Sequence, residues 1–242
     1  AMFEALVAAT DRLSKEKSVR VVVLSGEGRA FCAGLDMGRF AAMKEKGGNG
    51  VAGGESRDLT KRTHGQANFP QQAVWGWRQL PVPVIAAITG VAFGGGFQLA
   101  LGADIRLMAP DARMSIMEIK WGLVPDMAGT PILASLVRDD ILRELTYTGR
   151  IFSAQEAVSY GLATRVVDDP RAAAMEMARD IAAKNPHAIR ANKRMMNNLS
   201  VDPGPALLAE SVEQQRLLGS PNQTEAVRAN MEKRAPKFAE AG

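Results

Sequence analysis

The 242-residue chain has few of the side chains from which metal sites and disulfides are built. It contains one cysteine, Cys32, and two histidines, His64 and His187, which lie far apart in the sequence. A single cysteine excludes an internal disulfide and is typical of a reducing compartment. The three residues match no zinc-binding spacing. We therefore expect no metal and no bound cofactor.

The chain also has only a small excess of positive charge and no long apolar run. The net charge of +4 gives no reason to expect nucleic acid or anionic lipid as a partner. No apolar run reaches the roughly 20 residues of a membrane-spanning helix and no signal peptide is visible, so we expect a cytoplasmic protein without membrane contact. The chain opens without Met and directly on a helical pattern, from which we expect that residues upstream are missing.

The order of the predicted elements favours an α/β protein. Continuous apolar runs predict buried strands at residues 19–24, 84–88, 105–108 and 163–167. Apolar residues at helical spacing predict helices at residues 2–15, 70–79, 129–137 and 141–145. After a capping box at Ser153-Ala-Gln-Glu156, the chain is helical from residue 171 onward. We expect an α/β core in residues 1–170 and an all-helical region in residues 171–242.

Two polar stretches are open to a functional or a structural interpretation. Residues 45–58 are rich in glycine and predict a surface loop, either a lid over a site or an insertion without function. The basic run from Arg190 to Arg194 predicts a solvated helix face, with coenzyme A phosphates or RNA as alternative contacts.

Two glycine loops follow predicted strands and form the first candidate site. Gly94-Gly95-Gly96 opens a helix, and such a junction points free backbone N–H groups and the positive end of the helix dipole at one spot. Phosphate-binding and dinucleotide fingerprints both fail here, which leaves an oxyanion site for acyl chemistry or a turn without chemistry. If the strand before Cys32-Ala33-Gly34 is a parallel neighbour, one N–H from each loop can bind the same oxygen.

A third segment adds two carboxylates. Glu118 lies among apolar residues, where desolvation would raise its pKa toward the range of a general base; a salt-bridged structural acid is the alternative. Asp126 follows Pro125 just before a predicted helix, so it is either a helix N-cap or a second acid in the site.

Four segments, in order along the chain, resemble the crotonase (enoyl-CoA hydratase/isomerase) superfamily. They read A-F-C-A-G-L-D, G-V-A-F-G-G-G-F-Q-L-A-L-G-A-D-I-R, E-x-x-x-G-L-V-P-D-x-x-G-T and G-R-I-F-S-A-Q-E-A-V-S-Y-G-L-A. With the tail, the resemblance spans essentially the whole chain. It implies a crotonase-like α/β core, a ββα spiral whose first strands are absent from this numbering, and a C-terminal all-helical region that mediates trimerisation.

The resemblance also assigns roles to individual residues. Ala33 and Gly95 match the two oxyanion N–H donors, which would hold the thioester oxygen of an acyl-CoA as it becomes an enolate. The two glutamates of the hydratases match position 98 and Glu118, but position 98 is Gln, which cannot transfer a proton. Asp126 matches the catalytic aspartate of the dienoyl-CoA isomerase branch. Further substrate contacts are implied for Cys32, Gly34, Leu35, Asp36 and Gly94, and for Lys237 and Phe238 in the closing motif.

These assignments favour an acyl-CoA enzyme that stabilises a thioester enolate, leaning to double-bond isomerisation with Glu118 as the base. Hydration, as in fatty-acid β-oxidation, is the main alternative. Hydrolysis or dehalogenation with a carboxylate nucleophile, and a non-catalytic scaffold that binds coenzyme A or RNA, stay open. Coenzyme A enters as part of the substrate, and the partner is a homotrimer or a dimer of trimers. We expect the tail to pack at the trimer contact through Met175, Ile181, Ile189, Met195, Leu207 and Leu208.

Overall fold

A computed structural model describes residues 2–34, 58–183, 186–198, 203–234 and 236–237. Its strands are β1 (Val22–Ser25), β2 (Val84–Ile88), β3 (Val91–Phe93), β4 (Ile105–Met108), β5 (Arg113–Ser115), β6 (Phe152–Ser153) and β7 (Arg165–Val166). The helices of the first part are α1 (Met2–Lys15), α3 (Phe69–Gln79), α4 (Gly95–Leu101), the 3-10 helix η1 (Glu118–Trp121), α5 (Gly129–Leu133), α6 (Asp139–Thr148) and α7 (Ala154–Ser159). The tail contains α8 (Pro170–Ala182), α9 (Pro186–Asn198), α10 (Gly204–Leu217) and α11 (Pro221–Met231).

The described strands form two small sheets. The larger is parallel, in the order β1-β2-β4-β7, and the smaller has the order β3-β5-β6 with β3 and β5 parallel. The chain passes from the first sheet to the second within three residues, since β2 ends at Ile88 and β3 begins at Val91. Gly90 makes this turn possible: its φ is +60°, and a Cβ there would lie 2.0 Å from the carbonyl oxygen of Arg29.

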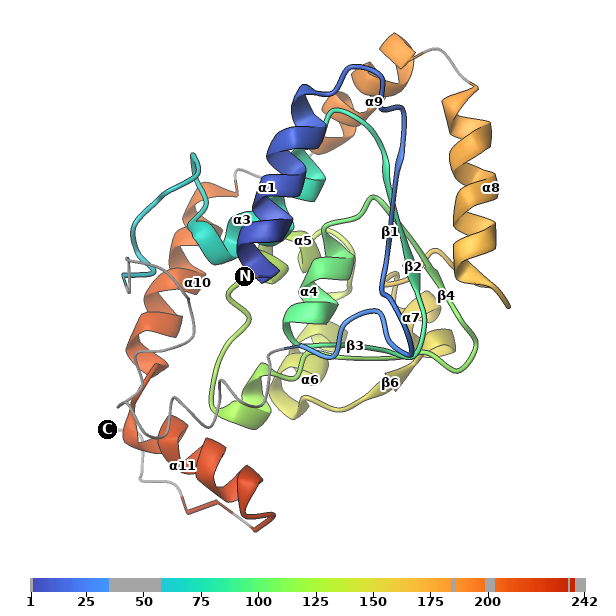
Figure 1. Cartoon of the computed structure of the whole chain (residues 1–242). Coiled ribbons are helices and arrows are strands. Elements are labelled where there is room, and N and C mark those ends of the chain that lie inside the picture. The colour runs from blue at the N-terminus through green and yellow to red at the C-terminus, as the bar shows by residue number, and fades with distance from the viewer. Residues whose placement is uncertain (1, 35–57, 184–185, 199–202, 235, 238–242) are drawn as a thin grey trace.

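Helices cover both faces of the larger sheet (Figure 1). On β2 the side chains of Ile85 and Ala87 pack against Ala174 and Ala178 of α8, whereas the alternate side chains enter the main core with α3 and α4. This alternation follows from the two-residue period of a strand, and every residue of β2 is buried because both faces are covered. The start of the tail therefore packs on the sheet of its own chain.

The structure corrects several expectations for individual elements. The strand predicted at 19–24 begins only at Val22, and it is half-buried because β1 stands at an edge of the described sheet. The helix predicted at 129–137 ends at Leu133. The basic run on α9 is not a fully solvated face, because Lys193 is buried. Its ammonium donates to Asp104 Oδ2 at 2.7 Å and to the carbonyl oxygen of Val82 at 2.8 Å.

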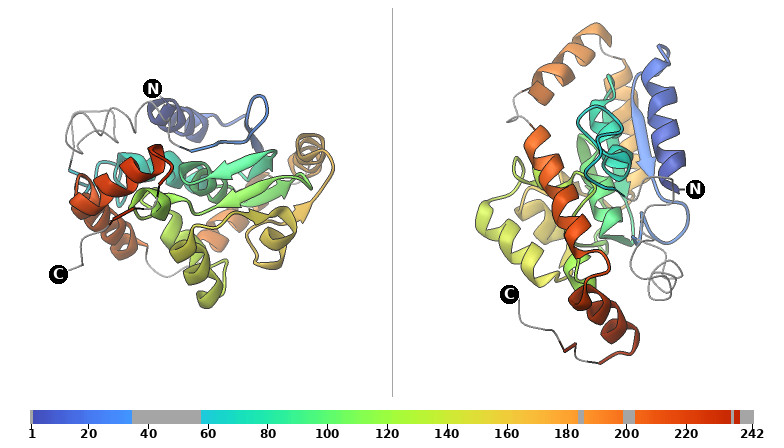
Figure 2. Two further views of the ribbon diagram at one scale, coloured as in Figure 1. Left: turned by 90° about the horizontal axis from the view of Figure 1, so that it is seen from below. Right: turned by 90° about the vertical axis from the view of Figure 1, so that its left-hand side faces the viewer.

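The later helices of the tail run along one side of the core (Figure 2). Ser211 of α10 is fully buried, and its hydroxyl accepts hydrogen bonds from Arg62 and from Asn68, the N-cap of α3. Of the side chains expected at a trimer contact, Leu207 is instead fully buried within its own chain and Ile181 packs against the larger sheet, whereas Leu208 keeps 44% of its surface exposed. Met196 is also exposed. No helix in the described residues is long and apolar enough to cross a membrane.

Candidate active site

The two glycine loops meet beside β3. Cys32 pairs with Ala92 of β3 as an isolated parallel bridge, and its carbonyl oxygen accepts the N–H of Phe93 at 3.1 Å. A Cβ on Gly96 would lie 2.1 Å from the same carbonyl oxygen, so only glycine lets α4 begin this close to the first loop. The structure therefore confirms that the Cys32-Ala33-Gly34 loop lies beside the start of α4.

Both predicted oxyanion donors stand at this junction. Gly94 precedes α4 with φ +52° and its own N–H donates to the carbonyl oxygen of Ser115. Gly95 is the first residue of α4, so its N–H has no acceptor within the helix. Ala33 lies on the facing loop, and within the described residues nothing accepts its N–H. That the two N–H groups converge on one oxygen stays a prediction.

Glu118 lies against this junction. A Cβ on Gly94 would be 3.6 Å from Glu118 Oε1, and only 9% of the Glu118 surface is exposed. Burial raises the pKa of the Glu118 carboxyl above its ordinary value, against smaller lowering effects of a backbone N–H and of Gln98. Oε2 is buried, and nothing in the described part of the chain bonds to it. Within the described residues, the alternative of a salt-bridged structural acid is not supported, because the side chain that bonds to Glu118 is the amide of Gln98.

Gln98 links Glu118 to the start of α5. Its Nε2 donates to Glu118 Oε1 at 2.7 Å, and its Oε1 accepts the N–H groups of Met127 at 2.8 Å and Gly129 at 3.0 Å. The side chain is almost fully buried at 1% exposure. Gln98 therefore has a fixed orientation, with its acceptor toward α5 and its donor toward the carboxylate.

Asp126 is not the N-cap of α5. The helix begins at Gly129, and the cap position belongs to Ala128, which has φ +66° and no side-chain cap bond. Gln98, 31 residues away in sequence, accepts the first helical N–H instead. Asp126 is half-buried and precedes Met127, whose N–H is held by Gln98.

Met127 was missed by the sequence prediction. Its sulfur would lie 3.1 Å from a Cβ on Gly95, so the thioether covers the first residue of α4. No pattern in the sequence indicates this contact.

The remaining predicted contacts lie elsewhere or outside the description. The N–H of Lys237 donates to Glu225 Oε1 at 2.8 Å, beyond α11. Leu35, Asp36 and Phe238 fall outside the described residues, as does most of the stretch 45–58. Among the described residues no group of histidine, cysteine and acidic side chains could hold a metal ion.

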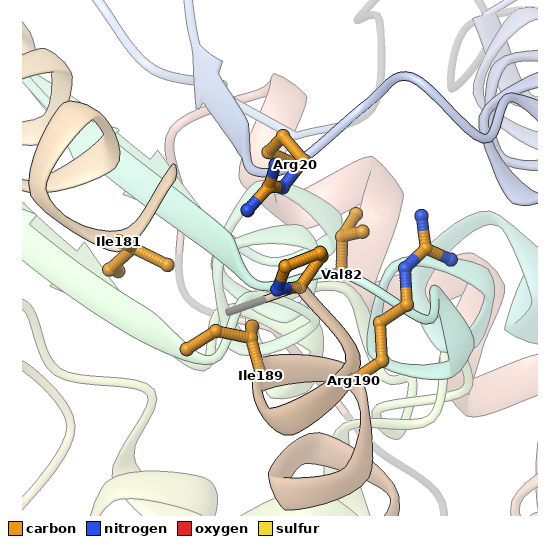
Figure 3. A pocket seen from close by; sticks show the side chains of 6 residues that line it. Arg20, Val82, Ile181, Ile189 and Arg190 are labelled. Atoms are coloured by element: carbon orange, nitrogen blue, oxygen red, sulfur yellow. The ribbon is translucent and has the colours of Figure 1, made fainter. Parts of the chain in front are cut away.

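A shallow crevice where β1, α8 and α9 meet is a separate feature (Figure 3). Arg20, Val82, Ile181, Pro186, Ile189 and Arg190 line it. No predicted site residue is among them. The candidate active site is the pair Gln98 and Glu118, with Glu118 against Gly94 at the start of α4.

Comparison with known proteins shows the family of the chain. The family model described as enoyl-CoA hydratase/isomerase matches residues 1–241. The chain belongs to the enoyl-CoA hydratase/isomerase family. It is 35% identical over 235 residues to the carnitinyl-CoA dehydratase of Proteus mirabilis, which covers 94% of this chain and 84% of the relative. It is 32% identical to the peroxisomal Delta(3,5)-Delta(2,4)-dienoyl-CoA isomerase of Arabidopsis thaliana, with 96% and 84% covered.

Family membership also fixes the fold. The crystal structure of an enoyl-CoA hydratase/isomerase from Pseudoalteromonas atlantica superposes with a TM-score of 0.80 at 26% identity, covering 98% of this chain and 88% of the other. The two sheets with their covering helices are therefore a crotonase fold, as the four sequence segments predicted. The chain is an enzyme of the enoyl-CoA hydratase or isomerase kind.

Proposed function

We propose that this enzyme moves a double bond in an enoyl- or dienoyl-CoA, with Glu118 as the base. The observation that carries the proposal is the neutral side chain at position 98. Glu118 is the one proton-transferring group in the pair, and its Oε2 is free of protein partners within the described residues. Gln98 uses its acceptor for two backbone N–H groups and one donor for Glu118, and an amide takes up no proton at neutral pH.

The proposed reaction needs only one base, and its atoms and electrons balance. Glu118 Oε2 takes a proton from the carbon next to the thioester, and the electron pair spreads onto the thioester oxygen. The N–H groups of Ala33 and Gly95 hold that oxygen as it becomes negative. Glu118, or Asp126 as a second carrier, returns a proton to the far carbon of the conjugated system. One C–H bond breaks and another forms, so no water is consumed.

The environment of Glu118 supports this role. Burial raises the pKa of the Glu118 carboxyl, which makes it a stronger base than an exposed carboxylate. Water addition places a further demand on the site, because a water must be activated while a proton is delivered to carbon. In the hydratases that the chain resembles, two carboxylates share that work.

Hydration is the second candidate. The carnitinyl-CoA dehydratase of Proteus mirabilis, by its name, handles water, and it is more similar to this chain than the dienoyl-CoA isomerase. The amide of Gln98 has a second N–H with which it could orient a water beside Glu118.

A panel of acyl-CoA substrates separates the two. We expect conversion of 3-enoyl-CoA or 3,5-dienoyl-CoA, followed by the ultraviolet absorbance of the conjugated thioester, to exceed hydration of crotonyl-CoA. Glu118→Gln should lower turnover by about 10²–10⁴-fold, the usual worth of a general base. Asp126→Asn should do the same only if Asp126 carries the second proton. Efficient crotonyl-CoA hydration with both isomerase substrates untouched would refute the isomerase proposal and assign Gln98 to the water.

The proposal extends to assembly as a trimer or a dimer of trimers. Met196 of α9, Leu208 of α10 and Ile119 of η1 keep 44–59% of their surface exposed, and a subunit contact would cover these side chains.

A further inference from the structure

The short helix that carries Glu118 satisfies only half of its own carbonyl groups. Within η1 and its cap, the N–H of Gly122 donates to the carbonyl oxygens of Glu118 and Ile119. The N–H of Leu123 also donates to the Glu118 carbonyl at 3.1 Å. The last two carbonyls of a helix have no such partners in their own turn.

Helix α11 supplies the missing donors. Asn230 Nδ2 donates to the carbonyl oxygen of Lys120 at 3.2 Å, and Gln223 Nε2 donates to that of Trp121 over a longer 3.5 Å. Gln223 Oε1 in turn accepts the N–H of Gly219 at 3.1 Å, which fixes the direction of its amide. Two side chains about 100 residues downstream therefore cap η1 from outside.

Packing holds the same two elements together. A Cβ on Gly122 would lie 2.9 Å from Gln223 Cα and 3.1 Å from Ala226 Cβ, so α11 rests directly on the turn that ends η1. Leu123 and Val227 are buried against each other in a small cluster completed by Trp121, Leu217, Leu218 and Met231. Figure 1 shows α11 beside this turn, away from the sheets.

We infer that Gln223 and Asn230 are positioning residues for Glu118. This rests on the proposed function insofar as Glu118 acts as the base. The carboxylate is held at Oε1 by Gln98, and its backbone is held by η1, whose end depends on α11. Without the two donors, the carbonyl of Lys120 loses its cap, the end of η1 loses both side-chain bonds to α11, and η1 unwinds from that end. A shift of about 1 Å in a catalytic group costs up to about 10²-fold in rate.

The double variant Gln223→Ala/Asn230→Ala tests this, with Thr224→Ala as the matched control. Thr224 is exposed on α11, its backbone N–H donates to the Ser220 carbonyl, and its hydroxyl has no hydrogen bond among the described residues. Amide hydrogen exchange at Gly122 and Leu123 is the readout that needs no assumption about the reaction. We expect it to accelerate at least tenfold in the double variant and to stay unchanged in Thr224→Ala.

Turnover is the second readout, on whichever acyl-CoA the wild type converts best, together with deuterium uptake at the carbon next to the thioester in D₂O. We expect kcat to fall about 10- to 100-fold with KM within about twofold, and the acidic limb of the kcat profile to move as the Gln98 contact loosens. If the double variant does not fold, the single variant Asn230→Ala, at a half-buried position, replaces it in both measurements. Unchanged exchange at Gly122 and Leu123, or kcat equal to that of the control, overturns the inference. A wild type that hydrates and does not isomerise overturns only the proposed function.

Discussion

Replacing Gln98 by Glu tests the central contact of the site. The new carboxylate would keep one oxygen to accept the N–H groups of Met127 and Gly129. Its other oxygen would take the place of the amide nitrogen that now lies 2.7 Å from Glu118 Oε1. A hydrogen bond would become a contact between two carboxylates of nearly the same volume, so the change alters charge and leaves packing in place.

The size of the effect follows from that distance. Two unit charges 2.7 Å apart repel by about 6 kcal/mol at an effective dielectric constant of about 20. Since one pH unit is worth about 1.4 kcal/mol, the folded pair keeps one shared proton well above the ordinary carboxyl pKa. The folded-state pKa is then raised, so the variant is most stable relative to the wild type below the ordinary pKa. As pH rises, the variant loses stability relative to the wild type, by up to about 1.4 kcal/mol per pH unit in the range where Glu118 of the wild type is ionised.

Thermal unfolding between pH 5 and pH 8 measures this. At this chain length 1 kcal/mol corresponds to roughly 2–4 °C, so the gap in Tm between variant and wild type should widen by several degrees with rising pH. The double variant Gln98→Glu/Glu118→Gln exchanges amide and carboxylate and should lose most of this pH dependence. A gap that is constant across the pH range would mean that the two side chains do not meet. We also expect hydration of crotonyl-CoA to rise at least tenfold in the single variant, because the site then has two carboxylates.

Two further predictions concern stability and assembly. Ser153→Ala removes the side-chain cap of α7, in which Ser153 Oγ accepts the Glu156 N–H at 3.2 Å. The substitution should lower the free energy of unfolding by about 1 kcal/mol and Tm by roughly 2–4 °C, with turnover unchanged. A loss of turnover without a loss of Tm would contradict a purely structural cap. Light scattering at micromolar concentration should give the mass of a trimer or hexamer, and a monomer would defeat the assembly proposal.

Local signals in the sequence were sufficient for the elements that local chemistry determines. The strand at 84–88 was predicted with its observed bounds because a run of five buried apolar residues stands between prolines and Gly90. The capping box at Ser153 was confirmed because its two reciprocal bonds join residues that lie only three positions apart in the sequence. The meeting of the two glycine loops was also predicted, but the structure achieves it in another way than a shared sheet edge: Cys32 pairs with Ala92 of β3, the strand directly before Gly94.

Contacts between distant segments could not be predicted in this way. Strand β3 has three residues between two glycines, which is too few for any periodicity. The residues of β5 that pair with it lie 22 positions further along the chain, so the smaller sheet was missed. Asp126 had the residue type and place of an N-cap, yet a glutamine from another helix does that work. Lys193 belongs to a basic run, but a carboxylate and carbonyls from the core surround its ammonium.

The neutral amide at position 98 suits a base that gains and loses a proton in each turnover. An amide donates to Glu118 Oε1 when the carboxyl is ionised, and the same oxygen still accepts when the proton sits on Oε2. A carboxylate at position 98 would match only the protonated state of Glu118 and would repel the ionised one. The acceptor side of Gln98 is meanwhile occupied by Met127 and Gly129, so the amide cannot flip without leaving both N–H groups unpaired. The start of α5 therefore fixes the orientation of Gln98, and Gln98 fixes which oxygen of Glu118 is left to take the proton.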